Sequence, residues 1–174
     1  MATVDGQTVA PDANGKIQGN GGDVDKMAGD SGNNQLQGHA DFNQYYGGAG
    51  NDTFVLAAKY GQTTDAATRD FSKLATYITD FHGADGDVAN SGNFGEHDFI
   101  NLSGFGEGSQ VKMVGEAATQ ANSGAAKVYY YSIFDTHTGD HYNFAVNSLN
   151  GKALGEHDFN FYASSSADHG LFVA

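Results

Sequence analysis

Residues 20–55 consist of four consecutive nine-residue segments without gaps, and no other feature constrains the fold of this chain as strongly. The segments read NGGDVDKMA, GDSGNNQLQ, GHADFNQYY and GGAGNDTFV. A short period with glycine-rich turns predicts a parallel coil, in which each segment supplies one turn and one very short strand. The sixth position is always Asp or Asn, and the eighth is always apolar or aromatic: Asp25, Asn34, Asn43 and Asp52 occupy the sixth, and Met27, Leu36, Tyr45 and Phe54 the eighth.

Two segments make one full coil, so the first segment stacks on the third and the second on the fourth. Turns on the same side then lie ~4.8 Å apart, and we expect Asp25 to approach Asn43 and Asn34 to approach Asp52. Stacked oxygens suit a hard cation such as calcium (Ca2+), which takes oxygen ligands. The candidate ligands within the repeat are Asp23, Asp25, Asn34, Asp41, Asn43, Gly48, Gly50 and Asp52.

The charge balance favours a bound cation as well. The chain has 21 acidic and 8 basic residues, a formal net charge of −13, so its compact form repels itself and also repels nucleic acid and anionic lipid. We expect neither as a partner, and no apolar run approaches the ~18 residues that would predict membrane insertion. The 25 glycines, 12 Phe and 9 Tyr predict short aromatic strands between tight turns. The absence of cysteine excludes disulfides, thiolate catalysis and sulfur-ligated zinc.

The repeat is too small to fold by itself. Its few core side chains contribute ~2 kcal/mol each, which does not offset the ordering of 36 residues at ~1.5 kcal/mol each. The coil therefore needs bound metal, a cap, or both, and we expect the rest of the chain to supply the cap.

The second half of the chain is mostly strand by pattern. We predict a short helix at residues 66–74 with Thr64 or Asp65 as its N-cap, and a hairpin whose turn lies near residues 138–140. Strands are predicted at 77–81, 99–105, 111–114, 127–134, 141–146 and 159–162. The expected fold is all-β: a parallel β-roll capped by an antiparallel β region with one short helix.

Three blocks of sequence resemble one known family. GGAGNDTFVL, YITDF and GEHDFINLSGF look like the C-terminal domains of type I-secreted RTX (hemolysin-type) proteins, including those of serralysin-type proteases and the R-modules of alginate epimerases. The resemblance covers residues 20–105 and implies calcium bound in a β-roll, with a further calcium site at Asp80 and Asp98. Asn101 stands where the family has a second Asp, and the loop between the last two blocks is long, with added acids at Asp85, Asp87 and Glu96.

The same resemblance bears on location. The first 19 residues have neither a positive n-region nor an apolar h-region, so we expect no cleavable signal peptide. The last residues, SSSADHGLFVA, are similar to the uncleaved C-terminal signals of type I exporters. We therefore expect a secreted, extracellular protein that uses the type I secretion machinery. The expected organisation is a lead-in (1–19), a single domain (20–163, with repeats at 20–55 and the cap at 56–163) and a signal-like tail (164–174).

The pentapeptide GEHDF occurs twice, at 95–99 and at 155–159. His and Asp are both zinc ligands, so a zinc site is one interpretation. The interpretation that we favour is that both copies are turns that lead into strands, with acids capping backbone amides.

No catalytic motif is present: the chain lacks H-E-x-x-H, G-x-S-x-G and cysteine. We expect no enzyme, although Glu96 and Asp98 form an acid pair of the kind that sugar hydrolysis uses. The favoured function is a calcium-binding RTX module that folds outside the cell. The alternatives are a polysaccharide (alginate-like) binding module and a small extracellular carrier of a ligand such as haem. The first alternative needs a basic track, for which Lys59, Arg69, Lys73, Lys112, Lys127 and Lys152 are available.

Overall fold

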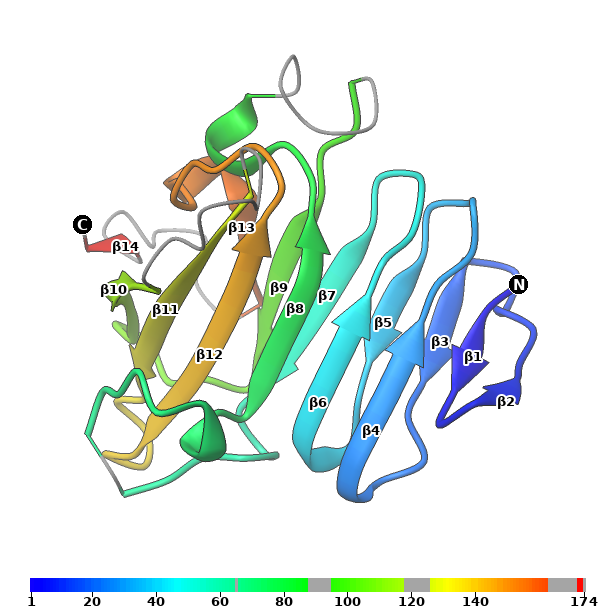
Figure 1. Cartoon of the computed structure of the whole chain (residues 1–174). Helices are drawn as coiled ribbons and strands as arrows, with labels where there is room; N and C mark the ends of the chain where they lie inside the picture. The colour runs from blue at the N-terminus through cyan, green and yellow to red at the C-terminus, as the bar shows by residue number, and fades with distance from the viewer. Residues whose placement is uncertain (65, 88–94, 118–125, 163–171, 174) are drawn as a thin grey trace.

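The computed structural model describes residues 1–64, 66–87, 95–117, 126–162 and 172–173 (Figure 1). In this part the regular structure is β-strand, with three short 3-10 turns and no α-helix. The strands are β1 (Thr3–Val4), β2 (Gln7–Thr8), β3 (Lys16–Gln18), β4 (Gly22–Ala28), β5 (Gln35–Gln37), β6 (Ala40–Tyr46), β7 (Thr53–Ala57), β8 (Thr76–Phe81), β9 (Phe99–Ser103), β10 (Gln110–Glu116), β11 (Lys127–Phe134), β12 (His141–Ser148), β13 (Phe159–Tyr162) and β14 (Phe172–Val173). The 3-10 turns are η1 (Phe71–Lys73), η2 (Ala84–Gly86) and η4 (Glu156–Asp158).

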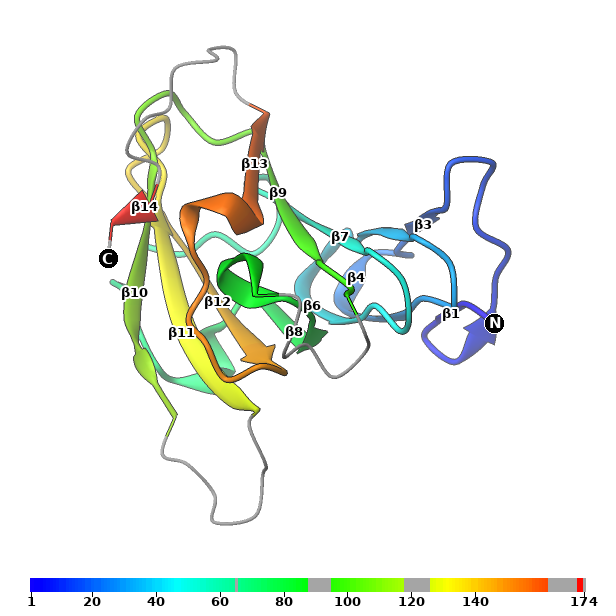
Figure 2. The same cartoon turned by 90° about the horizontal axis from the view of Figure 1, so that it is seen from above.

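The strands form two sheets. One has nine strands in the order β14-β10-β11-β12-β8-β6-β4-β1-β2, and the other has five in the order β13-β9-β7-β5-β3. From β3 to β9 the chain alternates between the sheets, and each strand pairs in parallel with the strand two places along. We call this part the parallel coil. Figure 1 shows β4, β6 and β8 in front of β5, β7 and β9, and Figure 2 shows the coil from above.

The register within the coil follows the nine-residue repeat. Asp25 pairs with Asn43 and Met27 with Tyr45 in the nine-stranded sheet, and Leu36 pairs with Phe54 in the other. The predicted neighbours in the repeat are therefore confirmed, because two nine-residue segments carry the chain once around both sheets.

The core lies between the two sheets and is built from two continuous rows of buried apolar side chains. Each row runs through successive strands at matching register positions, so every residue in it packs against its neighbours above and below. In the nine-stranded sheet the row is Val4, Met27, Tyr45, Ile78 and Val146, and in the five-stranded sheet it is Ile17, Leu36, Phe54, Ile100 and Phe159.

The first 19 residues are part of this architecture. Ile17 of β3 pairs with Leu36 and continues the apolar row of the five-stranded sheet, while β1 pairs with β4 in the antiparallel sense. Ile17 and Leu36 lie nineteen residues apart, whereas Leu36 and Phe54 lie eighteen apart. Because of this one-residue offset, β3 does not fit the nine-residue period and is not predicted by it.

All the strands predicted in the second half are present within one or two residues of their expected bounds. Strands β10, β11 and β12 are antiparallel, and β12 then pairs in parallel with β8 of the coil. The predicted hairpin is the β11–β12 connection, where the Asp135 N–H bonds the Asp140 carbonyl and Gly139 has φ +80°.

The prediction of a helix at residues 66–74 is wrong. Only η1 is present there, and its N-cap is Asp70 rather than Thr64 or Asp65. The physical reason is local: the Asp70 side chain accepts from both the Ser72 N–H and hydroxyl, and the Asp70 N–H donates to Thr68 Oγ1. Such side-chain bonds compete with helical backbone bonds.

Residues 163–171 and 174, which make up most of the predicted signal-like tail, lie outside the described part. The two residues of this tail that the structure describes, β14, pair in parallel with β10. None of the helical segments that the structure describes is long and apolar enough to cross a membrane.

Candidate metal centre at one edge of the coil

The sixth-position side chains of the repeat point inward, and all four are buried. Asn34 and Asp52 immediately precede β5 and β7, and Asp98 and Asp158 precede β9 and β13 in the same way. One column of Asn and Asp thus lines the edge of the five-stranded sheet where its parallel strands begin. We call this the strand-start edge.

Two carboxylates of this column, those of Asp52 and Asp98, each accept a backbone hydrogen bond from the preceding rung. Asp52 Oδ1 accepts a hydrogen bond from the Asn34 N–H at 2.8 Å, and Asp98 Oδ1 accepts from the Asp52 N–H at 2.9 Å. The second oxygen of Asp52 is also buried but has no hydrogen-bond partner in the described part of the chain. A buried carboxylate oxygen without a donor is costly, so its position destabilises the charged form of Asp52.

Further acids surround the last turn of the repeat, GGAGND. Asp80, at the end of β8, accepts from the N–H groups of Gly47 and Gly48 at 2.8 and 2.9 Å. Glu96 Oε1 accepts from the Gly50 N–H at 2.8 Å, while Glu96 Oε2 is a second buried oxygen without a hydrogen-bond partner among the described residues. Asp52, Asp80, Glu96 and Asp98 together form what we call the acidic cluster.

His82 is the basic group in contact with the cluster. Its Nδ1 lies 3.1 Å from Asp98 Oδ2, its backbone N–H donates to the same oxygen, and its Nε2 lies 3.8 Å from Glu96 Oε2. Burial lowers the pKa of His82, but Asp98, Asp80 and Glu96 together raise it above its ordinary value. A single imidazole therefore offsets only part of the negative charge of the four carboxylates.

The electrostatics of the cluster show that the charge is not fully compensated. Burial, with the charges of Asp98 and Asp80, raises the pKa of Asp52 to about 7. Burial and the charge of Asp98 raise the pKa of Asp80 to about 6, against hydrogen bonds from Gly47 and Gly48 that lower it. Burial also raises the pKa of Asp98. At neutral pH Asp52 is only partly protonated, so the cluster keeps negative charge in a buried place, which a cation would stabilise.

The side chains are not arranged around one point. Among the described residues, no three His, Asp or Glu groups already converge on a single metal position. The donor set nevertheless fits an oxygen-binding ion, because the unpartnered Asp52 oxygen adjoins further carboxylates and the glycine-rich turn. Of the residues predicted as ligands, the structure brings Asn34, Gly48, Gly50, Asp52, Asp80 and Asp98 to this edge.

The opposite edge of the repeat is different. Asp25 accepts hydrogen bonds from the N–H groups of Asn20, Gly21 and His39, and Asn43 bonds both ways with the Ala40 backbone. This edge therefore carries one satisfied carboxylate and a neutral amide. Asp23 and Asp41, also predicted as ligands, are exposed and hydrogen-bond to none of the other predicted ligands.

Sequence reasoning missed three participants at the strand-start edge. His82 lies two residues after Asp80, so the alternation of β8 places both side chains on the same face. This spacing is the sequence signal that could have identified His82. Glu96 was named as an added acid of the long loop and as one of an acid pair with Asp98, but not as a metal ligand. Asp158 stands in the second GEHDF at the position of Asp98 in the first, since the two copies lead into adjacent parallel strands, β9 and β13.

The pairing of the two GEHDF copies accounts for His97 of the first copy and Asp158 of the second. His97 of the first copy places Nε2 at 2.8 Å from Asp158 Oδ1 of the second. Asp158 Oδ2 accepts from the N–H groups of Asp85 and Gly155. These bonds close turns that lead into strands, which is the interpretation favoured from the sequence.

The comparisons with known proteins add no relative. No protein-family model, no curated protein and no solved structure matches this chain. The class of protein is therefore defined here by the fold alone: a mostly β protein whose two sheets contain parallel strands joined as a coil.

Proposed function

We propose that this chain is a calcium-binding module whose coil is stabilised when the ion neutralises the acidic cluster. The observation that carries the proposal is the buried Asp52 oxygen without a donor, next to Asp80, Glu96 and Asp98. A bound cation gives this oxygen the positive partner that no hydrogen-bond donor provides. The cation also lowers the free energy of the charged carboxylates around the site.

Calcium fits this edge better than the other common ions. The available donors are carboxylate, amide and backbone oxygens from a flexible glycine-rich turn, and calcium accepts six to eight such ligands with tolerant geometry. Zinc prefers cysteine and histidine; the chain has no cysteine, and among the described residues the cluster is in contact with one histidine, His82, beside four carboxylates. Magnesium demands a strict octahedron and gives up its water reluctantly.

The family resemblance supports a wider proposal, which concerns the family and the location of the protein as well as its metal. GGAGNDTFVL, YITDF and GEHDFINLSGF contribute Asp52, Asp80, Glu96 and Asp98 to this one edge. We therefore assign the parallel coil as an RTX-type β-roll of an extracellular, type I-secreted protein. Such a module stays loosely folded at the low free calcium of a cell interior and closes at the ~10⁻⁴–10⁻³ M calcium that extracellular modules bind.

Calorimetric titration of calcium into chelator-treated protein tests the proposal. We expect saturable binding to the wild type, at least about tenfold weaker binding to Asp52→Asn, and unchanged binding to Asp41→Asn, which removes an exposed acid. Magnesium at the same concentrations should bind more weakly than calcium. Equal loss of binding in both variants, or no calcium binding by the wild type, would contradict the assignment of the site.

A further inference from the structure

A cavity of about 540 Å³ lies at the opposite end of the same strands. Gln37, Ala57 and Ser103, at the ends of β5, β7 and β9, line it together with the turn after β7 and the β11–β12 hairpin. The acidic cluster lies where these strands begin and the cavity where they end, so the two are separate features of one sheet. The volume falls within the ~300–1,000 Å³ that small-molecule sites occupy.

One wall of the cavity is a rigid hydrogen-bonded network around Asp135. Its carboxylate accepts from the N–H groups of Gly106 and His137, from Gln62 Nε2 at 2.8 Å and from Thr138 Oγ1 at 3.3 Å, and Thr138 also donates to Gln62 Oε1. Burial opposes these bonds, yet together they hold the pKa of Asp135 below its usual range. The acid is thus ionised and its acceptor capacity is already used, so this wall orients a ligand without demanding a cation.

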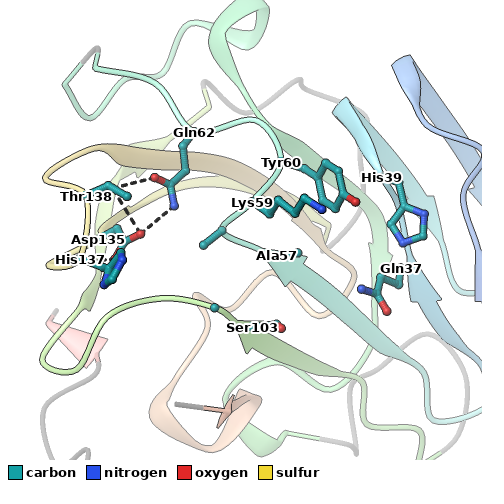
Figure 3. Close-up of a pocket in the computed structure, with 12 residues that line it drawn as sticks. Gln37, His39, Ala57, Lys59, Tyr60, Gln62, Ser103, Asp135, His137 and Thr138 are labelled. Atoms are coloured by element: carbon teal, nitrogen blue, oxygen red, sulfur yellow. Dashed lines mark hydrogen bonds between the residues drawn. The ribbon is translucent and has the colours of Figure 1, made fainter. Parts of the chain in front are cut away.

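The other wall is aromatic. Figure 3 shows Lys59, Tyr60 and His39 on the side away from the Asp135 network, with Ala57 and Ser103 between the two walls. The Lys59 ammonium lies 5.4 Å from the centroid of the Tyr60 ring, and the His39 ring lies 5.3 Å from it on a tilt. The ring therefore partly accommodates the lysine charge, and this wall presents the apolar face of Tyr60 next to the alanine surface that lies between the walls.

Several neutral hydrogen-bonding groups remain free in this cavity. The side chains of Gln37 and Ser103 and the hydroxyl of Tyr60 line it, and none of them hydrogen-bonds to another described residue. An amide and two hydroxyls provide both donors and acceptors. The free groups therefore match a ligand that is rich in hydroxyl groups and carries no net charge.

We propose that this cavity binds a neutral saccharide. The hydroxyls of a sugar would pair with Gln37, Ser103 and Tyr60, and its apolar C–H face would pack on the ring and alanine wall. An acidic sugar fits less well, because the chain carries a net charge of −13 and the wall opposite Lys59 contains the ionised Asp135. This inference does not depend on calcium binding, since it uses none of the acidic cluster.

The test is a titration of ¹⁵N-labelled, calcium-saturated protein with three neutral hexasaccharides of glucose or mannose: cellohexaose, maltohexaose and mannohexaose. We expect at least one to shift the backbone amides at the ends of β5, β7 and β9 and in the β11–β12 hairpin, and to leave those around Asn34, Asp52 and Asp98 unchanged. Gln37→Ala and Ser103→Ala should each weaken binding roughly fivefold. Lys112→Ala, which alters an exposed lysine on β10 outside the cavity, should not.

Two outcomes would overturn the inference. One is the absence of shifts at the cavity with all three neutral oligosaccharides, and the other is tighter binding of an oligogalacturonate than of any of them. Far-UV circular dichroism of each variant ensures that a loss of binding is not a loss of fold. Asp52→Asn protein should bind the saccharide with unchanged affinity, so failure of this inference and failure of the calcium proposal are distinguishable.

Discussion

The same side-chain type has two different roles in the repeat, and its neighbours decide which one. Asp25 and Asp52 both occupy the sixth position and both are fully buried. Three backbone N–H groups surround the carboxylate of Asp25, whereas Asp52 has one such donor and faces other carboxylates. Asp25 is therefore a structural cap, whereas the buried Asp52 carboxylate keeps one oxygen without a donor among the described residues, and this is the oxygen that we propose binds calcium.

The Asp52→Asn substitution should stabilise the protein in chelator and destabilise it in calcium. In chelator the substitution removes a buried charge and keeps an oxygen for the Asn34 N–H, so we expect the free energy of unfolding to rise by roughly 1–3 kcal/mol. In saturating calcium the variant should be less stable than the wild type. Urea unfolding under both conditions measures this change of sign; Asp41→Asn, at an exposed position, should show no such reversal.

Tyr45→Phe tests the link between the two sheets. The buried Tyr45 hydroxyl accepts from the Gly38 N–H at 2.8 Å and donates to the Val55 carbonyl at 3.0 Å, so it joins β6 to a turn and to β7. Phenylalanine leaves both backbone groups buried without a partner, and we expect a loss of about 1–3 kcal/mol. The same substitution at Tyr46, which is exposed, is the control and should cost almost nothing.

At the level of elements, the stacked turns are as closely packed as the strands. Gly48 has φ +91°, and a Cβ at this position would clash with the carbonyl oxygen of Asp30 in the turn below. Gly50 lies in the same way against Gly32. Glycine is required here by the close approach of one turn to the next as well as by the backbone conformation.

Gly48→Ala should therefore be more damaging than an alanine at an unpacked left-handed glycine. We expect a cost of about 3 kcal/mol or more, from positive φ and steric overlap together. Gly6→Ala is the matched control, because Gly6 has φ +79° and nothing within 4 Å of its Cβ position; it should cost only about 1 kcal/mol. Thermal unfolding of both variants in calcium gives the comparison, and equal costs would show that the turns are not tightly stacked.

How much of this could be predicted from the sequence depends on whether the pattern was periodic. The coil from β4 to β7 and the pairing of Asn34 with Asp52 follow from the nine-residue period, and the later strands follow from alternation. The one-residue offset at Ile17 concealed β3, and bonds made by Asp70 replaced the predicted helix. Glu96 reaches the Gly50 N–H from 46 residues away, a contact that no local pattern specifies.

For the whole molecule, the important quantity is the charge that folding brings together. The unfolded chain spreads its acids through water, while the folded chain holds Asp52, Asp80 and Asp98 beside one another in a buried place. Folding without an ion is therefore opposed by electrostatic repulsion and by desolvation, and the two rows of apolar residues have to overcome both.

This arrangement predicts an unusual dependence of stability on pH. In chelator, Asp52 and Asp80 hold protons in the folded state up to about pH 7 and about pH 6, whereas the unfolded groups lose them near 3.8. The folded state binds more protons in this interval, so the free energy of unfolding should fall as pH rises from about 4 to about 7. The raised pKa of His82 acts in the same direction.

Urea unfolding in chelator at about pH 5 and about pH 8 checks this sign. We expect lower stability at the higher pH, a smaller difference in Asp52→Asn, and a further reduction of the difference in calcium, because the ion competes with protons for the same oxygens. Stability that rises with pH in chelator would mean that these carboxylates are already compensated without an ion.

The most direct measurement of the central claim is the circular dichroism of the chain in chelator, followed by the addition of millimolar calcium. The account predicts a folded state of marginal stability in chelator, with a reduced β signal, a reduced near-UV signal from the buried tyrosines and a low melting temperature, and an increase in all three once calcium is added. Spectra and melting curves that are the same with chelator and with calcium would contradict it.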